Sequence, residues 1–226
     1  MPRIPRAATG SNILHIINRG NARATVFHSD SDYAGCINLL SKALDRFELE
    51  LYAFTLMPNH FHLVVHPQTP TQLSEFMQWW LTAQVRRHHS LRQTSGHVWQ
   101  GRFKSFPIQQ DEHLLTVLRY VLLNPVRAGL VREAQAWRWS SLRFPRFTTR
   151  WPVRYAGSLE SWLADPLAAE ELDRLRTSVA RKAPFGDPQW QRTVAGAAGL
   201  ATSLRPLGRP KHGPRHLEEQ SPLPEM

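Results

Sequence analysis

The sequence predicts an α+β fold, specifically a ferredoxin-like sandwich whose elements follow the order strand, helix, strand, strand, helix, strand (βαββαβ). Short runs rich in β-branched, aromatic and aliphatic residues are bounded by turn residues. Two longer segments repeat apolar residues every three to four positions, and the two kinds of segment alternate in the required order. The two helices of such a sandwich cover one face of the sheet and leave the other open.

The first strand and helix are predicted from the N-terminal third of the chain. Residues 12–20, NILHIINRG, are typical of a strand. The following HSDSDY offers Ser29, Asp30 or Ser31 as a helix cap. Apolar residues then recur at helical spacing, which predicts an amphipathic helix over residues 31–48.

A hairpin is predicted next. Residues 50–57 and 60–66 are apolar runs of strand length, and Pro58 and Asn59 between them are typical of a turn. The hairpin supplies the second and third strands of the sandwich.

Three more elements follow in the chain. Periodic apolar residues predict a helix over 73–90, and residues 102–110 resemble a strand. A further helix is expected over 112–124, with Asp111 as its cap and Pro125 forcing it to end. This last helix is an addition to the ferredoxin-like order.

The pattern weakens beyond about residue 145. Residues 158–181 are typical of a helix, whereas 203–226 are rich in Pro, Arg and Gly and predict a basic, poorly ordered tail. We therefore divide the chain into a domain at 1–145 and a helical extension with a Pro/Arg-rich tail at 146–226.

Composition limits the class of protein. With 42% apolar residues, the 226-residue chain can form one well-buried domain plus an appendage. No apolar run is long enough for a membrane helix, and MPRIPRAATG lacks the hydrophobic core of a secretion signal. The single cysteine, Cys36, excludes an internal disulfide and a thiolate zinc site. We expect a cytoplasmic protein with no membrane partner.

The charge of the chain indicates a polyanionic partner. The formal net charge is +10, the pI is about 10.7, and 24 of the 28 basic residues are arginine. Guanidinium groups match phosphate oxygens in pairs, so nucleic acid is the expected partner. A GC-rich genome that replaces lysine by arginine would explain the ratio of the two residues, but not the surplus of positive charge.

Residues 56–66, LMPNHFHLVVH, carry two histidines one residue apart in an apolar strand. Successive side chains of a strand point to opposite faces, so His60 and His62 share one face roughly 6–7 Å apart. Two imidazoles on one face make a partial site for a divalent cation, which needs at least one more ligand. The alternative is a pair of buried histidines satisfied by ordinary hydrogen bonds.

The helix over 112–124 supplies the missing ligand. Tyr120 and Asn124 are four residues apart and therefore lie on one face of it. If that face packs on the open side of the sheet, Asn124 completes a metal site with His60 and His62, and Tyr120 is left to attack what the metal holds. Alternatively, Tyr120 packs in the core with its hydroxyl in water.

Four segments offer DNA contacts, each with a structural alternative. In NRGNAR, Arg19 and Arg23 flank a glycine that would let the backbone approach a phosphate, or the segment is a simple turn. The RRHH patch at 86–89 is either a DNA contact or a solvated helix end.

The other two candidates lie further along the chain. In HVWQGRFK, Trp99 would stack on a base while Arg102 and Lys104 hold phosphate, or Trp99 packs in the core. Arg127 would reach the scissile phosphate or cap the preceding helix.

Several of these motifs occur in an order that resembles a known family. LMPNHFHLVV, then GHVWQGRFKSF, then LRYVLLNPVRAGLV resemble the REP-associated tyrosine transposases, a branch of the IS200-like single-tyrosine HUH transposases. The resemblance runs from about Asn12 to about Phe144 and includes NRGNAR at 18–23 and WRWSSLR at 137–143. It fades after residue 150, although GRPK at 208–211 resembles the basic tail of many members.

The resemblance implies an activity. Tyr120 falls at the nucleophile, and His60, His62 and Asn124 fall at ligands of Mg²⁺ or Mn²⁺, so residues 1–145 would be the catalytic domain. Such enzymes cleave and rejoin single-stranded DNA next to palindromic REP-like or BIME-like hairpins, through a 5′-phosphotyrosine intermediate. The implied protein is cytoplasmic, associated with the nucleoid, and a monomer or homodimer.

Three rival interpretations were weighed. The histidine-triad nucleotide hydrolases need a third alternating histidine, but Val64 stands there and His66 comes two residues later. Phosphodiesterases with two His-x-Thr/Ser motifs are disfavoured because the chain has no second copy. A domesticated hairpin-DNA binder without catalysis stays open.

Overall fold

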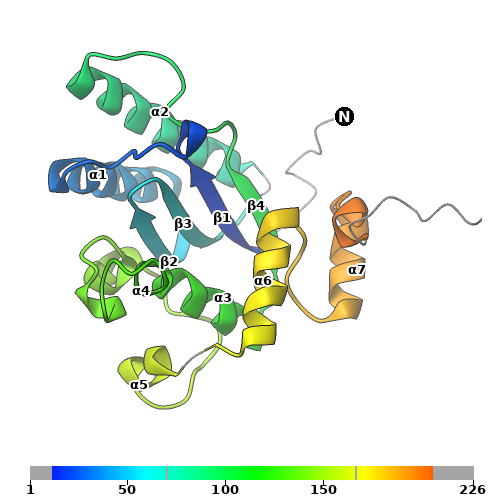
Figure 1. Cartoon of the computed structure of the whole chain (residues 1–226). Coiled ribbons are helices and arrows are strands. Elements are labelled where there is room, and N and C mark those ends of the chain that lie inside the picture. The colour runs from blue at the N-terminus through cyan, green and yellow to red at the C-terminus, as the bar shows by residue number, and fades with distance from the viewer. Residues whose placement is uncertain (1–11, 70, 166, 206–226) are drawn as a thin grey trace, which may run out of the picture.

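The computed structural model describes residues 12–69, 71–165 and 167–205. Its centre is an antiparallel sheet of four strands in the order β2-β3-β1-β4, which confirms the predicted ferredoxin-like α+β fold (Figure 1). The strands are β1 (Ile13–Arg19), β2 (Glu50–Met57), β3 (His60–His66) and β4 (Lys104–Ile108). The first three match the predicted bounds closely, and the fourth is shorter than the predicted 102–110.

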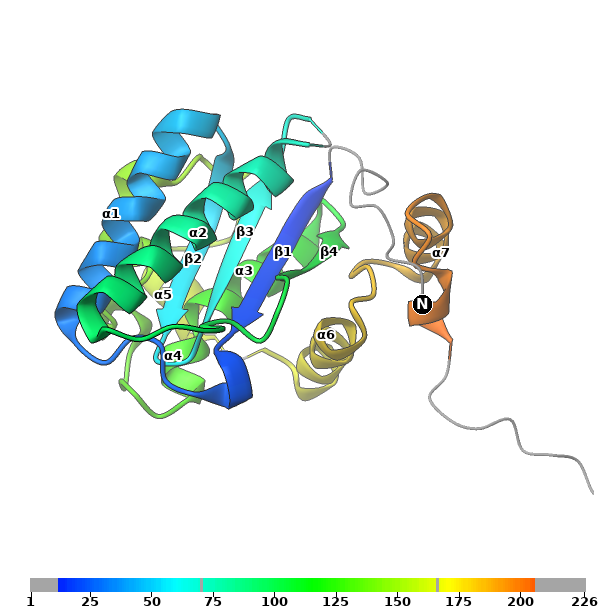
Figure 2. The ribbon, with the colours of Figure 1, turned by 90° about the horizontal axis from the view of Figure 1, so that it is seen from above.

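Two long helices cover one face of the sheet, as Figure 2 shows from above. They are α1 (Asp30–Phe47) and α2 (Gln72–Arg92). A capping box formed by Ser29 and Asp32 begins α1. Asp32 also accepts a hydrogen bond of 2.5 Å from Arg92 at the end of α2. Despite burial, this bond, with the bonds from the His28 and Ser29 amides, lowers the pKa of Asp32 to about 2. The two helices are thereby tied together.

The opposite face of the sheet is also covered. The third helix, α3 (Glu112–Leu122), packs on it and forms a second hydrophobic core with the residues of all four strands that face it (Figure 1). The extension contributes to the same core through Trp162, Leu163, Leu175 and Phe185. Residues beyond 145 therefore share a core with the sheet, while the proposed division at residue 145 stays a prediction.

The helix predicted over 112–124 ends earlier, and a one-turn helix, α4 (Asn124–Arg127), follows it. Pro125 has no N–H to donate to the carbonyl of Val121, four residues before it. That carbonyl instead accepts a hydrogen bond of 2.9 Å from the Thr55 hydroxyl of β2. Tyr120 and Asn124 consequently stand on either side of a helix break.

The single helix predicted over 158–181 is wrong, because the structure has α5 (Leu159–Ala164) and α6 (Ala169–Arg181) there. Proline at position 166 disfavours helical backbone at Asp165, which is extended (φ −70°, ψ 118°). The sequence analysis missed α7 (Pro188–Ala197), although Asp187 as cap and Pro188 in the first turn are its signal. Of the predicted tail, residues 206–226, which include GRPK, lie outside the described residues.

The outer strands of the sheet are both paired by later segments. The Leu56 amide of β2 donates to the Trp139 carbonyl at 2.9 Å, and the Phe185 amide donates to the Pro107 carbonyl of β4 at 2.9 Å. Pairing of this kind removes the open edges at which other chains would add. The short 3-10 segments are Asn21–Arg23, Ala134–Ala136, Ser141–Arg143, Pro145–Phe147 and Ala201–Leu204. None of the helices in the described ranges is long and apolar enough to cross a membrane.

The first prediction concerns Gly20, at the end of β1. A Cβ there would lie 2.2 Å from the Ala24 carbonyl oxygen and 2.9 Å from Val26 Cγ2. Gly20→Ala should therefore lower the free energy of unfolding by about 1–3 kcal/mol, measured by urea denaturation. Gly196→Ala is the control, because nothing lies within 4 Å of its added Cβ. Equal stability of Gly20→Ala and wild type would contradict the close approach at this turn.

Candidate active site

His60 and His62 lie side by side on the sheet face that packs against α3. His60 begins β3, opposite Met57 of β2 and Arg19 of β1. The centroids of the two imidazole rings are 5.1 Å apart, and the ring planes are inclined by 78°. The alternation of side chains along a strand thus places the pair as predicted, with His62 buried and His60 partly buried.

A third imidazole, which sequence reasoning missed, stands behind this pair. His15 of β1 is fully buried, and its Nε2 lies 2.8 Å from Nδ1 of His62. Its neighbour in the pattern, Ile17, pairs with His62 across the sheet. The signal was the alternation in ILHIIN, but only the pairing of β1 with β3 shows that the two histidines meet.

Burial keeps the three imidazoles uncharged at neutral pH. Burial lowers the pKa of His15 to about 3. Burial, and then the charge of Arg19, lower the pKa of His60 to about 4. The pKa of His62 is well below its ordinary value because of burial and then the neighbouring His15 and His60. Neutral imidazoles have a free lone pair and are the form that ligates metals.

The donor atoms present fit a divalent cation. Nδ1 of His60 lies 2.7 Å from Asn59 Oδ1, and Nδ1 of His62 lies 2.8 Å from Nε2 of His15. In both rings Nε2 has no hydrogen bond among the described residues. Holding one ring nitrogen with a neighbour while the other faces the ion is the usual arrangement of metal-bound histidine. Asn124 lines the same cavity and donates from Nδ2 to the Tyr120 carbonyl at 3.0 Å, which leaves its Oδ1 as a third donor.

Tyr120 lies in the last turn of α3, over the histidines. The centroid of its half-buried ring is 5.8 Å from that of His62 and 6.1 Å from that of His15, edge-on to both. The Arg127 guanidinium carbon stands 4.2 Å from the Tyr120 ring centroid, and this guanidinium also donates to the Tyr120 carbonyl. Desolvation lowers the pKa of Arg127 to about 10, so Arg127 stays charged at neutral pH. Arg127 therefore closes the helix end and fixes the tyrosine ring.

A cavity of about 840 Å³ is lined by His60, His62, Tyr120 and Asn124 and is strongly basic. Its walls include the predicted Arg19, Arg102 and Lys104, together with Asn18 and Gln100. The extension adds Arg176 of α6 and Lys182, the residue directly after α6, both of which sequence reasoning missed. Among the described residues, no Asp or Glu lines this cavity. Such an arrangement of cations around neutral imidazoles suits an anionic ligand such as a phosphodiester.

Three predicted DNA contacts, Arg23, Trp99 and Arg127, do not line this cavity. Arg23 is exposed at a left-handed position (φ 63°), and its carbonyl accepts from Asn59 Nδ2 at 3.0 Å. Trp99 is only 6% exposed and packs with its ring centroid 5.2 Å from that of Phe61. Its Nε1 donates to Gln84 Oε1 at 3.1 Å. Trp99 therefore packs in the core, which was the structural alternative, and we do not propose it as a base-stacking residue.

The RRHH patch also makes structural contacts. Arg87 donates to the Ser31 carbonyl at 3.0 Å, and the two ring nitrogens of His89 lie 2.9 Å from Thr94 Oγ1 and 3.0 Å from the Gly96 carbonyl.

A second group of possible metal donors, Asp111, Glu112 and His113, lies at the other end of α3. Asp111 accepts from the His113 amide at 2.9 Å and lies 2.8 Å from its Nδ1. Capping of the helix accounts for this group.

The fold places a tyrosine beside a histidine pair in one basic cavity, which is the arrangement of a tyrosine-based nucleic-acid-binding domain and not of a metal store or a membrane protein's pore. The description "Transposase IS200 like" matches residues 9–124, which is just over half of the chain. The chain belongs to the IS200-like transposase family. The matched region ends at Asn124 and contains both histidines and Tyr120.

Individual relatives are more distant. The chain is 29% identical over 108 residues to a Haemophilus influenzae protein assigned as a REP-associated tyrosine transposase. That match spans 43% of this chain and 61% of the relative's length. The REP-associated tyrosine transposase of Escherichia coli is 23% identical over 115 residues, 51% of this chain and 67% of the relative.

One solved structure supports the fold. The structure of a REP-associated tyrosine transposase bound to a REP hairpin has a TM-score of 0.52 and 16% identity. The similarity covers 71% of this chain and 91% of that one. At this identity the likeness establishes the fold alone.

The second prediction concerns pH. A buried histidine whose pKa is lowered on folding binds its proton more readily in the unfolded chain. Stability should therefore be complete above about pH 6.5 and fall as the pH drops toward the folded pKa values of about 4 for His60 and about 3 for His15.

Each of the two fully buried imidazoles, His15 and His62, should lower the free energy of unfolding by up to about 1.4 kcal/mol for each pH unit below pH 6.5. Urea denaturation at pH 7.5 and 5.5 in EDTA measures the slope. His28 is exposed, so His28→Ala serves as the control and should show the same slope of stability against pH. A stability that rises on acidification would contradict the neutral state of His15, His60 and His62.

Proposed function

We propose that this protein is a divalent-metal-dependent transposase that cuts and rejoins single-stranded DNA beside a short hairpin. The observation that carries the proposal is the convergence of His60, His62, Asn124 and Tyr120 on one basic cavity, to whose lining the described residues contribute no carboxylate. A carboxylate-free basic cavity disfavours a cationic substrate and favours a phosphodiester. Membership of the IS200-like family supports the same reaction class.

His60, His62 and Asn124 would hold Mg²⁺ or Mn²⁺. Such an ion polarises a phosphate oxygen and offsets the charge that develops there. The role of the protein is to present two neutral imidazoles and one amide oxygen at the floor of the cavity. His15 orients the ring of His62 through its contact with Nδ1.

Tyr120 would be the nucleophile. Its oxygen attacks phosphorus, a bond forms between them, and the bond from phosphorus to the 3′ oxygen breaks to release a 3′-hydroxyl. The 5′ side of the break stays attached to Tyr120 as a phosphodiester. Because this diester keeps the energy of the original bond, attack by a 3′-hydroxyl reverses the step and joins DNA without ATP.

The cations around the cavity would hold the DNA backbone. Arg19, Arg102 and Lys104 come from the sheet side, and Arg176 and Lys182 from α6. One tyrosine cuts one strand at a time, and a partly enclosed cavity suits a splayed strand better than a closed duplex. The solved relative bound to a REP hairpin supports a hairpin as the partner.

The remaining expectations are part of the proposal. The protein is expected to act in the cytoplasm on nucleoid DNA, as a monomer or homodimer. The chain spans 61% of the length of the Haemophilus influenzae relative, so the activity of the whole relative comes to this chain only as a proposal.

The third prediction tests the nucleophile. Tyr120→Phe removes only the phenol oxygen, so it should abolish cleavage and the covalent adduct while hairpin binding stays nearly intact. Labelled hairpin-bearing single-stranded DNA from the gene's own flanks is incubated with Mn²⁺ and analysed on denaturing gels. The same oligonucleotide annealed to its complement is the control and should be cut little or not at all.

The outcomes separate three possibilities. Cleavage by Tyr120→Phe would show that another residue attacks. Equal cutting of the perfect duplex would show that the substrate is wrong. Hairpin binding by wild type with no adduct at any metal concentration would identify a hairpin-DNA binder without catalysis.

The fourth prediction tests the metal site. His60→Ala or His62→Ala leaves one imidazole and an amide, which hold a divalent ion weakly. We expect metal-dependent cleavage to be lost in either variant and poorly rescued by excess Mn²⁺. Mn²⁺ affinity, measured by calorimetry without DNA, should fall in parallel. His28→Ala is the matched control, and undiminished cleavage by His60→Ala or His62→Ala would remove the metal site from the proposal.

A further inference from the structure

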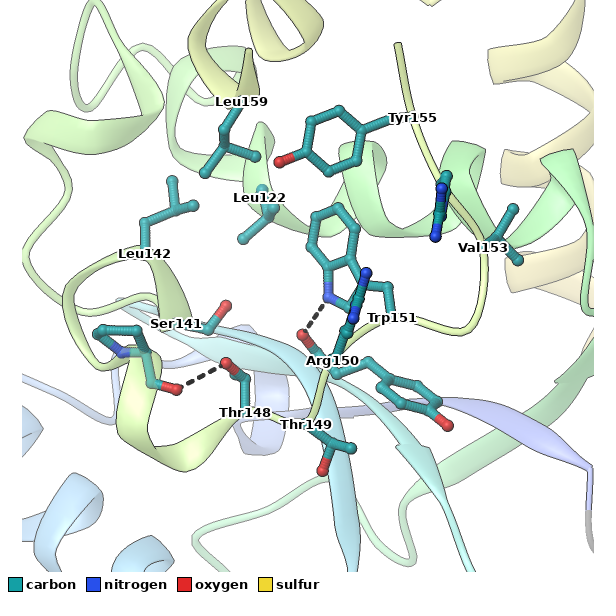
Figure 3. A pocket seen from close by; sticks show the side chains of 13 residues that line it. Leu122, Ser141, Leu142, Thr148, Thr149, Arg150, Trp151, Val153, Tyr155 and Leu159 are labelled. Carbon is teal, nitrogen blue, oxygen red and sulfur yellow. Dashed lines mark hydrogen bonds between the residues drawn. The ribbon is translucent and has the colours of Figure 1, made fainter. Parts of the chain in front are cut away.

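A second cavity, distinct from the candidate active site, lies where the segment after α4 wraps past the end of α3. Its volume is about 790 Å³, within the size range of sites for one small organic ligand, about 300–1,000 Å³. None of its lining residues lines the basic cavity around Tyr120. Its apolar lining includes Leu122, Leu142 and Leu159, and Figure 3 shows them around the hollow.

Aromatic rings form a fixed wall of this cavity. Trp151 donates from Nε1 to the Tyr52 carbonyl at 2.8 Å, and its ring centroid is 5.5 Å from that of Tyr155. Both rings also pack on the buried Trp162, at 5.5 and 5.1 Å between centroids. In Figure 3 the rings of Trp151 and Tyr155 stand together, across the hollow from Leu142. Half-buried rings held in this way keep part of their surface open to a flat ligand.

The rim of the cavity is positively charged. Arg150 and Arg154 line it, are exposed, and form no ion pair with any described residue. No Asp or Glu lines the cavity in the described part of the chain. Thr148 and Thr149, labelled in Figure 3, also line the cavity and add hydroxyl groups. The combination of aromatic faces, free guanidinium groups and hydroxyls matches a planar ring that carries an anionic group.

We propose that this cavity binds one unpaired nucleotide of a DNA strand, with the base against Trp151 and Tyr155 and the phosphate at Arg150 and Arg154. Base stacking on aromatic side chains and phosphate contact by arginine are the two interactions by which proteins hold single strands. The identification of the ligand as DNA rests on the proposed function. The cavity itself rests only on the geometry of residues 141–159 and of the elements beneath them.

The cavity has a direct structural connection to the nucleophile. Leu122, in its lining, is two residues after Tyr120 on α3. A nucleotide held there would fix the strand at a second point, outside the cavity that holds the scissile phosphate. The cut position would then be set by the distance between the two points.

Binding of a fluorescent hairpin oligonucleotide with single-stranded flanks, measured by anisotropy in EDTA, tests this site. Tyr155→Ala should weaken binding about tenfold, because one stacked base is lost. Tyr155→Phe keeps the ring and should bind like wild type. A series of oligonucleotides, each with one abasic position in the flank, then identifies the nucleotide. At that position the abasic change should weaken binding to wild type but not further weaken binding to Tyr155→Ala.

The arginines give an independent measurement that does not depend on the aromatic wall. Arg150→Ala and Arg154→Ala change exposed side chains and should each reduce the slope of log affinity against log salt by about 0.7. Arg143→Ala is the matched control, because Arg143 is exposed in the same segment but does not line the cavity. It should keep the wild-type slope.

Three results would overturn the proposal. They are wild-type affinity in Tyr155→Ala, unchanged salt slopes in both arginine variants, and abasic effects that add fully to Tyr155→Ala at every position. A fourth result would reject it in favour of a free nucleotide as the ligand. In that result Tyr155→Ala loses binding of deoxythymidine monophosphate but keeps wild-type binding of the oligonucleotide. Adduct formation by these variants at saturating DNA is measured separately, so failure of this site is distinguishable from failure of the Tyr120 reaction.

Discussion

The hydrogen bond from the Thr55 hydroxyl to the Val121 carbonyl, 2.9 Å long and fully buried, fixes the geometry on which the candidate site depends. Pro125 leaves that carbonyl without its helical donor, and an unpaired buried carbonyl would cost about 1–3 kcal/mol. Thr55 lies directly opposite His62 in the β2–β3 register. The same bond therefore satisfies the broken helix and anchors the residue after Tyr120 one strand away from His62.

The break in the helix also provides the other polar groups of the site. The carbonyl of Tyr120 accepts hydrogen bonds from the Asn124 side chain and from Arg127. If the helix continued unbroken through Asn124, the backbone amide of Asn124 would donate to the Tyr120 carbonyl. The side chains of Asn124 and Arg127 would then lose this acceptor. The proline thus ends the helix and lets Asn124 and Arg127 hold its last turn, so Tyr120 is fixed from both its ring and its backbone.

The cations that line the basic cavity repel one another, which is unfavourable for the folded protein. Burial keeps the imidazoles of His15 and His62 neutral, so these two rings add no charge to the cluster. Nδ1 of His15 is buried without a partner in the described structure. Uncompensated positive charge and an unpaired polar atom both reduce stability, and such features concentrate where a ligand supplies the balance. Under the proposed function, a phosphodiester would bring negative charge to this cluster of cations.

The sequence allowed the strands, the first two helices and the placement of His60 and His62 to be predicted, because these depend on local periodicity and on the alternation along one strand. It predicted the Tyr120 and Asn124 pair from helical spacing, although a helix break separates them. His15, Arg176 and Lys182 were missed because they meet the site only through strand pairing and through the path of the extension. Trp99 shows the opposite case, since an aromatic beside cations has the same local pattern in a core as in a DNA-binding surface.

The family match ends at residue 124, yet the described residues beyond it complete the surroundings of the site. Helix α6 forms a wall of the basic cavity, Phe185 pairs with the edge of β4, and residues 141–159 line the second cavity. The first part of the chain therefore holds His60, His62 and Tyr120, and the later part forms walls of both cavities. Leu175 of α6 and Trp162 of α5 pack into the same core as the sheet, so the position of Arg176 on α6 depends on that packing. Under the proposed function, the choice of substrate would therefore depend on the packing of the extension as well as on the residues that touch the phosphate.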